Sequence, residues 1–334
     1  MMWHQSMHKR RNLGACLVSG ANGFLGSALL RHLRMLGTQK LIGTVRDIST
    51  LATVASGTGV QIFEVGDIDG TTDWSTALSG VQSVVHAAAR VHVMYEMPSA
   101  DTISLFRRTN VEATLHLARQ AAVAGVERFV YVSSVKVNGE RTAPHRPFFE
   151  DSAPRPEDAY AISKYEAEKG LAKIEAQTGM QLVVVRPPLV YGPGVRANFA
   201  SLMKAVARGA PLPLAAVQNR RSLVALDNLV DFIATCMVHP AAAGQTFLVS
   251  DGEDVATADL VRRLAQAMHR PARLFAVPPG ILTAAASFLG RRAQAQRLCE
   301  SLQVDISKAR SLLDWTPPIG LDEGLRRAVE GVTR

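Results

Sequence analysis

The stretch SGANGFLGSALL, residues 19–30, spaces three glycines three residues apart, directly after the apolar run of residues 15–18. Glycine is costly inside regular structure, so this spacing indicates a tight turn or a backbone that a ligand approaches closely. A strand, a glycine-rich turn and an immediate helix can hold phosphate groups, because the first N–H groups of a helix are unpaired and carry partial positive charge. The residues expected to line this dinucleotide site are Gly20, Asn22, Gly23, Phe24, Leu25 and Gly26.

Apolar runs alternate with helix-like segments on both sides of this loop. The predicted strands are residues 15–19, 40–45, 60–65, 82–87, 128–134 and 181–187. The predicted helices are residues 24–36, 103–124 and 158–178. Repeated βα units with fully buried strands are typical of the α/β class, so the sequence predicts a Rossmann-type doubly wound parallel sheet.

The chain changes character after Pro187 and Pro188, where alternation weakens and short helices dominate. We expect a loose basic tail at residues 1–11, a dinucleotide-binding domain at 12–187, and a smaller, mostly helical substrate lobe at 188–334. One more strand, near residues 246–251, is predicted in the second part and could return to the main sheet.

Composition narrows the class of protein. The chain has 334 residues, 47% hydrophobic and 20% charged, which is typical of a soluble globular protein. Its three cysteines form neither a disulfide framework nor a metal-ligand spacing, so we expect a cytoplasmic protein without a metal site. The net charge is +8, but the basic residues are scattered, so no nucleic-acid partner is expected.

The most apolar late segment, residues 275–290, is interrupted by Pro278, Pro279 and Gly280. It is too short for a membrane span, and no signal peptide is recognisable. A buried or surface helix is the preferred interpretation. Interfacial membrane contact is the alternative, because Arg291 and Arg292 follow.

The residue after the second strand predicts the cofactor. An acidic side chain there binds the ribose of NAD, whereas an arginine accommodates the phosphate of NADP. Arg46 follows the predicted strand and favours NADP(H); Asp47 competes one residue later and keeps NAD(H) possible. The other expected cofactor contacts are Asp67 and Ile68 after the third strand and Ala87, Ala88 and Ala89 after the fourth.

Tyr160 and Lys164 lie four residues apart on one face of a predicted helix. A nearby ammonium favours the ionised phenol, so the pair predicts an acid/base group with a pKa closer to neutrality. Ser133 and Ser134 end a strand upstream, where a hydroxyl can hold a substrate oxygen beside the phenol.

These motifs together resemble the extended short-chain dehydrogenases/reductases of the NAD-dependent epimerase/dehydratase family, which act on nucleotide sugars. The resemblance runs from about residue 14 to 330. It rests on the stretches GANGFLG, GDI, HAAA, SSVKVNG, YAISK, RPPLVYGPG and VDISKARSLLDWTPP. It implies that Ser134 binds substrate, Tyr160 is the acid/base and Lys164 anchors the ribose. The further residues it implies are Asn110, Pro187 and Val190 on the cofactor side, Asn198 in contact with the substrate, and Arg221 on the substrate diphosphate.

Departures from the family pattern bear on the reaction. Dehydratases of this group carry an Asp-Glu pair after the active-site hydroxyl, where this chain has Val135 and Lys136, so dehydration is disfavoured. Asn138 replaces the tyrosine of many 4-epimerases. The stretch SSVKVNGE resembles enzymes of the UDP-N-acetylquinovosamine dehydrogenase type, which supply surface polysaccharide precursors. We therefore expect an NAD(P)H-dependent reductase of the 4-keto group of a UDP-linked 6-deoxy-N-acetylhexosamine.

Three alternatives stay open at this stage. One is a UDP-hexose or UDP-N-acetylhexosamine 4-epimerase that retains its NAD. The second is a reductase of steroid-like or flavonoid-like ketones, and the third a non-catalytic dinucleotide-binding subunit. The resemblance also implies a homodimer formed through the long helices at 103–124 and 158–178.

Overall fold

The computed structural model describes residues 13–50, 59–91, 100–143, 145–288, 290 and 292–330. The tail expected at residues 1–11 lies outside these ranges. Two compact units make up the chain. The first unit comprises residues 1–137, 156–185 and 230–247, and the second comprises 138–155, 186–229 and 248–334.

The first unit is built on a seven-stranded sheet in the order β3-β2-β1-β4-β5-β6-β9. Its strands are β1 (Cys16–Ser19), β2 (Leu41–Val45), β3 (Val60–Glu64), β4 (Ser83–His86), β5 (Arg128–Val132), β6 (Gln181–Arg186) and β9 (Gln245–Leu248). The pairings from β3 to β6 are all parallel. The order reverses between β1 and β4, which is the point where ligands bind in such sheets. The predicted fold class is confirmed.

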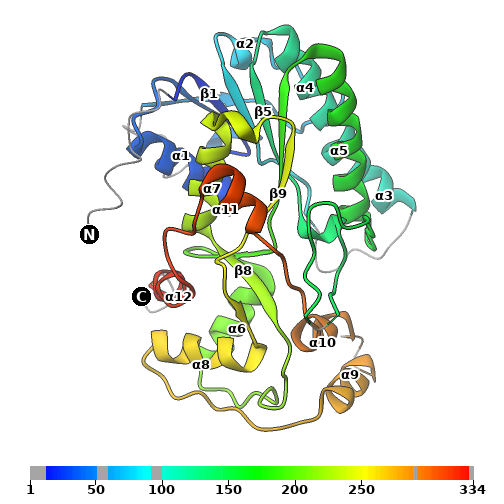
Figure 1. The fold of residues 1–334 in the computed structure, drawn as a ribbon, viewed down its shortest axis with the longest axis vertical. Helices are drawn as coiled ribbons and strands as arrows, with labels where there is room; N and C mark the ends of the chain where they lie inside the picture. The colour runs from blue at the N-terminus through cyan, green and yellow to red at the C-terminus, as the bar shows by residue number, and fades with distance from the viewer. Residues whose placement is uncertain are drawn as a thin grey trace. The chain divides into compact units, whose positions relative to one another are not determined.

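Helices cover both faces of this sheet (Figure 1). They are α1 (Phe24–Met35), α2 (Ser75–Leu78), α3 (Ala100–Arg107), α4 (Ala113–Val123), α5 (Ala159–Thr178) and α7 (Leu226–Val238), with 3-10 turns η1 (Ile48–Thr50), η3 (Val135–Val137) and η4 (Pro240–Ala242). Strands β1, β2 and β5 are buried along their whole length, because both faces of the sheet are covered. This burial explains why their sequences are continuous apolar runs.

The helix predicted at residues 103–124 is interrupted. A π-helical turn, η2 (Arg108–Glu112), separates α3 from α4. Such turns widen the helix by one residue and occur often at functional sites. Here the turn carries Asn110, which is 1% exposed.

The second unit contains a three-stranded sheet in the order β10-β8-β7. Its elements are β7 (Leu189–Tyr191), β8 (Arg221–Ala225), β10 (Asp254–Val255), α6 (Ala197–Ala207), α8 (Thr257–Ala267), α9 (Pro279–Phe288), α10 (Arg292–Cys299), α11 (Ser307–Leu313) and α12 (Leu321–Val329). The division expected at 187/188 implied two consecutive parts of the chain. In the structure each unit instead consists of three separate stretches. The chain passes between the units several times, and β9 returns to the edge of the first unit's sheet.

The apolar segment at 275–290 forms the surface helix α9, none of whose described residues is buried. Among the described residues, no helix is both long and apolar enough to cross a bilayer.

Candidate active site

The glycine-rich turn is so tight that the positions of Gly20 and Gly26 leave no room for a side chain. A Cβ atom on Gly26 would lie 2.1 Å from the carbonyl oxygen of Gly20, and Gly20 itself has a φ of +72°. A Cβ on Gly20 would lie 3.0 Å from the backbone of Ala88. The turn leaves Asn22 and Gly23 exposed at the start of α1. This cradle, which a Cβ would fill, fits the phosphates of a dinucleotide.

A buried hydroxyl connects this turn to the loop after β4. Ser19 ends β1 and is the register partner of His86 at the end of β4. The Ser19 Oγ lies 2.7 Å from His86 Nδ1 and accepts hydrogen bonds from the backbone N–H groups of Ala87 and Ala88, each at 3.2 Å. The two small residues expected beside a flat ligand are therefore fixed by the strand that carries the turn.

His86 is a neutral positioning residue. Its Nε2 lies 2.9 Å from Thr114 Oγ1, whose single proton is donated to the Asn110 carbonyl. Nε2 must therefore carry the imidazole proton, and Nδ1 accepts from Ser19. Burial and the charge of Lys164 lower the pKa of His86 to about 3, so this tautomer persists across the physiological range.

Asn110 joins the same network to the helix that carries Tyr160. Its Nδ2 donates to Ser163 Oγ at 3.0 Å and to the Arg90 carbonyl at 3.0 Å, and its Oδ1 accepts from the Arg90 N–H at 2.8 Å. Ser163 in turn donates to the Tyr160 carbonyl at 2.7 Å. The structure therefore gives Asn110 a supporting position between the loop after β4 and α5.

The residues expected to choose the cofactor lie after β2 and β3. Strand β2 ends at Val45, so Arg46 is the first residue after this strand. Its Nε lies 2.8 Å from Asp67 Oδ1, and both side chains are more than three-quarters exposed. Ile68 beside Asp67 is half-buried. Arg46 and the acidic residue expected at the adenine therefore contact each other.

Ser134, Tyr160 and Lys164 come together at the carboxyl end of β5. Tyr160 and Lys164 stand one turn apart at the start of α5, and Ser134 follows β5 by two residues. The Lys164 Nζ donates to the Val132 carbonyl at 2.8 Å and lies 5.9 Å from the centre of the Tyr160 ring. A side-chain hydrogen bond joins Tyr160 to Ser134, whose Oγ also accepts from the Lys136 N–H at 3.2 Å.

The expected direction of the Tyr160 pKa is wrong for this structure. Burial and the Asp158 carboxylate raise the pKa of Tyr160 above its ordinary value, and the bond with Ser134 offsets only part of this. Burial also lowers the pKa of Lys164 to about 7, against a smaller opposing effect of Glu168. The lysine is itself desolvated, so near neutral pH it is not a fixed full positive charge beside the phenol.

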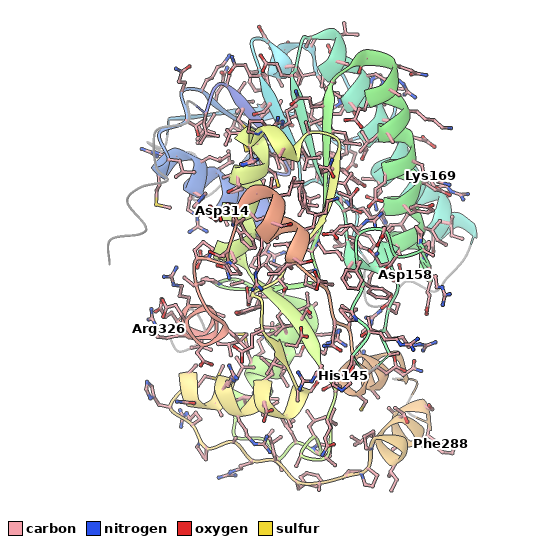
Figure 2. The ribbon with its side chains drawn as sticks, viewed as in Figure 1. His145, Asp158, Lys169, Phe288, Asp314 and Arg326 are labelled. Carbon is pink, nitrogen blue, oxygen red and sulfur yellow. The ribbon has the colours of Figure 1, made fainter. Side chains whose placement is uncertain are left out.

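The Asp158 carboxylate caps α5 and holds Lys136. Its Oδ1 accepts from the Ala161 N–H at 2.7 Å, and its Oδ2 accepts from Lys136 Nζ at 2.6 Å. Figure 2 labels Asp158. Lys136, where dehydratases carry an acid, therefore supports the helix start. In the second unit Asn138 is fully buried, with its Oδ1 3.1 Å from Arg186 Nη1.

The remaining expected site residues, for substrate and for cofactor, all lie in the second unit. Arg221 begins β8, and its Nη1 donates to the carbonyls of Arg297 and Glu300 at 2.8 and 3.0 Å. Burial, with repulsion from Arg297, lowers the pKa of Arg221. Asn198 is exposed in the first turn of α6, whereas Pro187 is buried and Val190 half-buried.

Sequence reasoning missed Ser19, His86, Thr114, Ser163 and the capping role of Asp158. Ser19 and His86 did carry a signal, because each is a polar residue ending an apolar strand at the edge where ligands bind. Thr114 and Ser163 carried none, since their contacts depend on the π-helical turn and on helix packing.

Comparisons with known proteins show the family of this chain. The NAD dependent epimerase/dehydratase family model matches residues 16–250. A UDP-glucose 4-epimerase of Vibrio cholerae is 44% identical over 315 residues, which cover 94% of each chain. The finer resemblance to the UDP-N-acetylquinovosamine dehydrogenase type has no support from this relative.

Solved structures share the fold over nearly the whole chain. The UDP-glucuronic acid 4-epimerase of Bacillus cereus, in complex with NAD, matches with a TM-score of 0.77 at 20% identity and covers 96% of both chains. MoeE5, in complex with UDP-glucose and NAD, matches with a TM-score of 0.72 at 26% identity and covers 96% of this chain and 99% of its own. The family model and the Vibrio cholerae relative show that the chain is an enzyme of the NAD dependent epimerase/dehydratase family.

Proposed function

We propose that the protein is a UDP-hexose 4-epimerase that uses NAD(H). The observation that carries this proposal is the 44% identity to the Vibrio cholerae UDP-glucose 4-epimerase along 94% of both chains. The Ser134, Tyr160 and Lys164 arrangement supplies the groups that the reaction needs. The alternative considered above, epimerisation with a retained cofactor, is thus better supported than reduction of a 4-keto sugar.

Tyr160 is the proposed acid/base at the C4 oxygen of the sugar. As a base it accepts the hydroxyl proton, and as an acid it returns a proton to the oxygen after the sugar has presented its other face. NAD, when bound in the glycine cradle, supplies a reversible hydride acceptor for the hydrogen on C4. Ser134 holds the same oxygen by a hydrogen bond. Because the pKa of Tyr160 is raised in the structure, the phenol rests protonated and must lose this proton before it can accept one from the C4 hydroxyl.

Lys164 acts on the Tyr160 phenol in both steps. Its ammonium, when protonated, stabilises the phenolate that Tyr160 forms as a base. The Val132 carbonyl fixes the Nζ position at 2.8 Å, so the lysine cannot swing away when the phenol changes charge. Since burial lowers the pKa of Lys164 to about 7, small changes in the site can alter its charge near neutral pH.

NAD(H) is the proposed cofactor, in place of the NADP(H) that Arg46 suggested. The two solved relatives described above hold NAD. The Arg46 guanidinium is paired with Asp67, and this contact would have to open before Arg46 could bind an additional phosphate. Asp47, one residue later, accepts from the Ser49 N–H through its Oδ1 at 2.8 Å.

The test is to incubate purified protein with UDP-glucose and, separately, with UDP-N-acetylglucosamine, without added cofactor. The proposal predicts conversion of at least one into its C4 epimer, no net change in nicotinamide absorbance, and release of NAD from the protein on denaturation. Stoichiometric oxidation of NADPH or NADH by a UDP-linked 4-keto-6-deoxy sugar, with no epimerisation, would instead establish the reductase.

A further inference from the structure

Helix α9 turns an apolar stripe toward solvent. Ile281 is 60% exposed and Phe288 is 93% exposed, and they lie seven residues apart, on the same side of the helix. The residues between them on that side, Ala284 and Ala285, are exposed as well. An ordinary surface helix places its apolar stripe against the core, so the pattern of α9 is inverted.

The opposite side of α9 makes the contact with the rest of the second unit. Leu282 is partly buried and packs against that unit's core, and α9 packs on α10. Phe288 projects from the end of the helix (Figure 2). The exposed stripe is therefore not the face through which α9 packs on its own unit, and it is available to an external partner. Phe275, which is 49% exposed, adds apolar surface just before the helix.

The segment of chain that carries α9 has charge of one sign. Residues 264–299 contain no aspartate or glutamate and contain five arginines: Arg270, Arg273, Arg291, Arg292 and Arg297. Arg270 and Arg273 are exposed. An apolar helix face flanked by arginines suits the interface of an anionic bilayer, where the apolar side chains enter the acyl region and the cations remain at the phosphates.

We propose that α9 docks this protein reversibly on an anionic lipid bilayer, lying in the plane of the interface. A second copy of the chain is the less suitable occupant. Two-fold contact through this face would bring the same arginine-rich segment of each copy together, in a chain whose net charge is already +8. An anionic surface is attracted by that charge. The inference is independent of which sugar the enzyme epimerises.

The test is flotation of the full-length protein with two kinds of vesicle, pure phosphatidylcholine and a mixture rich in phosphatidylglycerol. The wild-type protein is expected to float with the anionic vesicles, and raised salt should weaken this binding. The double variant Ile281→Ser and Phe288→Ser should bind at least about tenfold more weakly, because it removes two large apolar side chains from the bilayer.

Met35→Ser is the matched control, since Met35 is also an exposed apolar side chain (78%) but lies on α1. It should float like wild type, and circular dichroism should show all proteins equally folded. Absence of wild-type binding to anionic vesicles, or equal binding of the double variant, would overturn the proposal. So would a wild-type dimer that the double variant dissociates while neither protein floats.

Discussion

Lys164 is buried to 2% exposure, yet the proposed mechanism uses its charge. Burial lowers the pKa of Lys164 to about 7 from an ordinary value of 10.5. Between these two values the unfolded chain binds one more proton than the folded chain at this residue. Stability attributable to Lys164 is therefore lowest below pH 7 and increases as the pH rises toward 10.5.

The Lys164→Met variant should lose this dependence. Measured by urea unfolding, the free energy of unfolding of wild type relative to the variant should rise with pH, by up to about 1.4 kcal/mol per pH unit in this window. Lys169→Met is the control, because Lys169 is an exposed lysine on the same helix (Figure 2). If the difference in free energy of unfolding between wild type and Lys164→Met did not change with pH, the ammonium would not be desolvated.

Gly26 allows a direct test of the cradle. The Cβ of a Gly26→Ala variant would lie 2.1 Å from the Gly20 carbonyl oxygen, so the turn must open. We expect a loss of about 1–3 kcal/mol in stability and loss of the bound NAD that denaturation releases from the wild type. Gly280→Ala places its Cβ in open space and should change neither property. Normal NAD binding by Gly26→Ala would contradict the assignment.

At the scale of the element, α5 depends on its first turn. Asp158 accepts from the Ala161 N–H as the helix cap and holds Lys136 with its other oxygen. Asp158→Ala removes both contacts, whereas Asp158→Ser retains a cap but not the ion pair. The free energy of unfolding of the alanine variant should be about 1 kcal/mol lower than that of the serine variant.

Both substitutions should also change the pH profile. The Asp158 carboxylate raises the pKa of Tyr160, so its removal favours the phenolate. The acidic limb of kcat/KM for the alcohol substrate should then move to lower pH in both variants. An unchanged profile, with only the stability difference observed, would restrict Asp158 to a structural role.

Helices and strands could be predicted where the signal lies within one short segment of the sequence. The strands of the first unit and the start of α1 follow from local apolar runs and glycines, whereas the Asp158 cap at the start of α5 was missed. The Ser19 to His86 contact could not be predicted, because it needs the register between β1 and β4. The pKa of Tyr160 was also beyond the sequence, since its direction depends on how far the surrounding elements exclude water.

At the scale of the whole molecule, the chain's path between the two units was the least predictable feature. Residues 138–155 leave the first unit between Ser134 and Tyr160, and residues 230–247 return to it as α7 and β9. A single boundary at residue 187 could not represent this path, because composition changes only once along the chain. The position of the candidate site could be predicted from the sequence, because the carboxyl ends of β1, β4 and β5 lie at one edge of a parallel sheet.

The central claim, epimerisation by removal and return of the same hydrogen at C4, is tested most directly with UDP-glucose deuterated at C4. The account predicts that the epimer formed in ordinary water keeps its deuterium at C4, without added cofactor, and that Tyr160→Phe, while still binding NAD, forms almost none. Loss of the deuterium to solvent, or no epimer from any UDP-hexose, would contradict it.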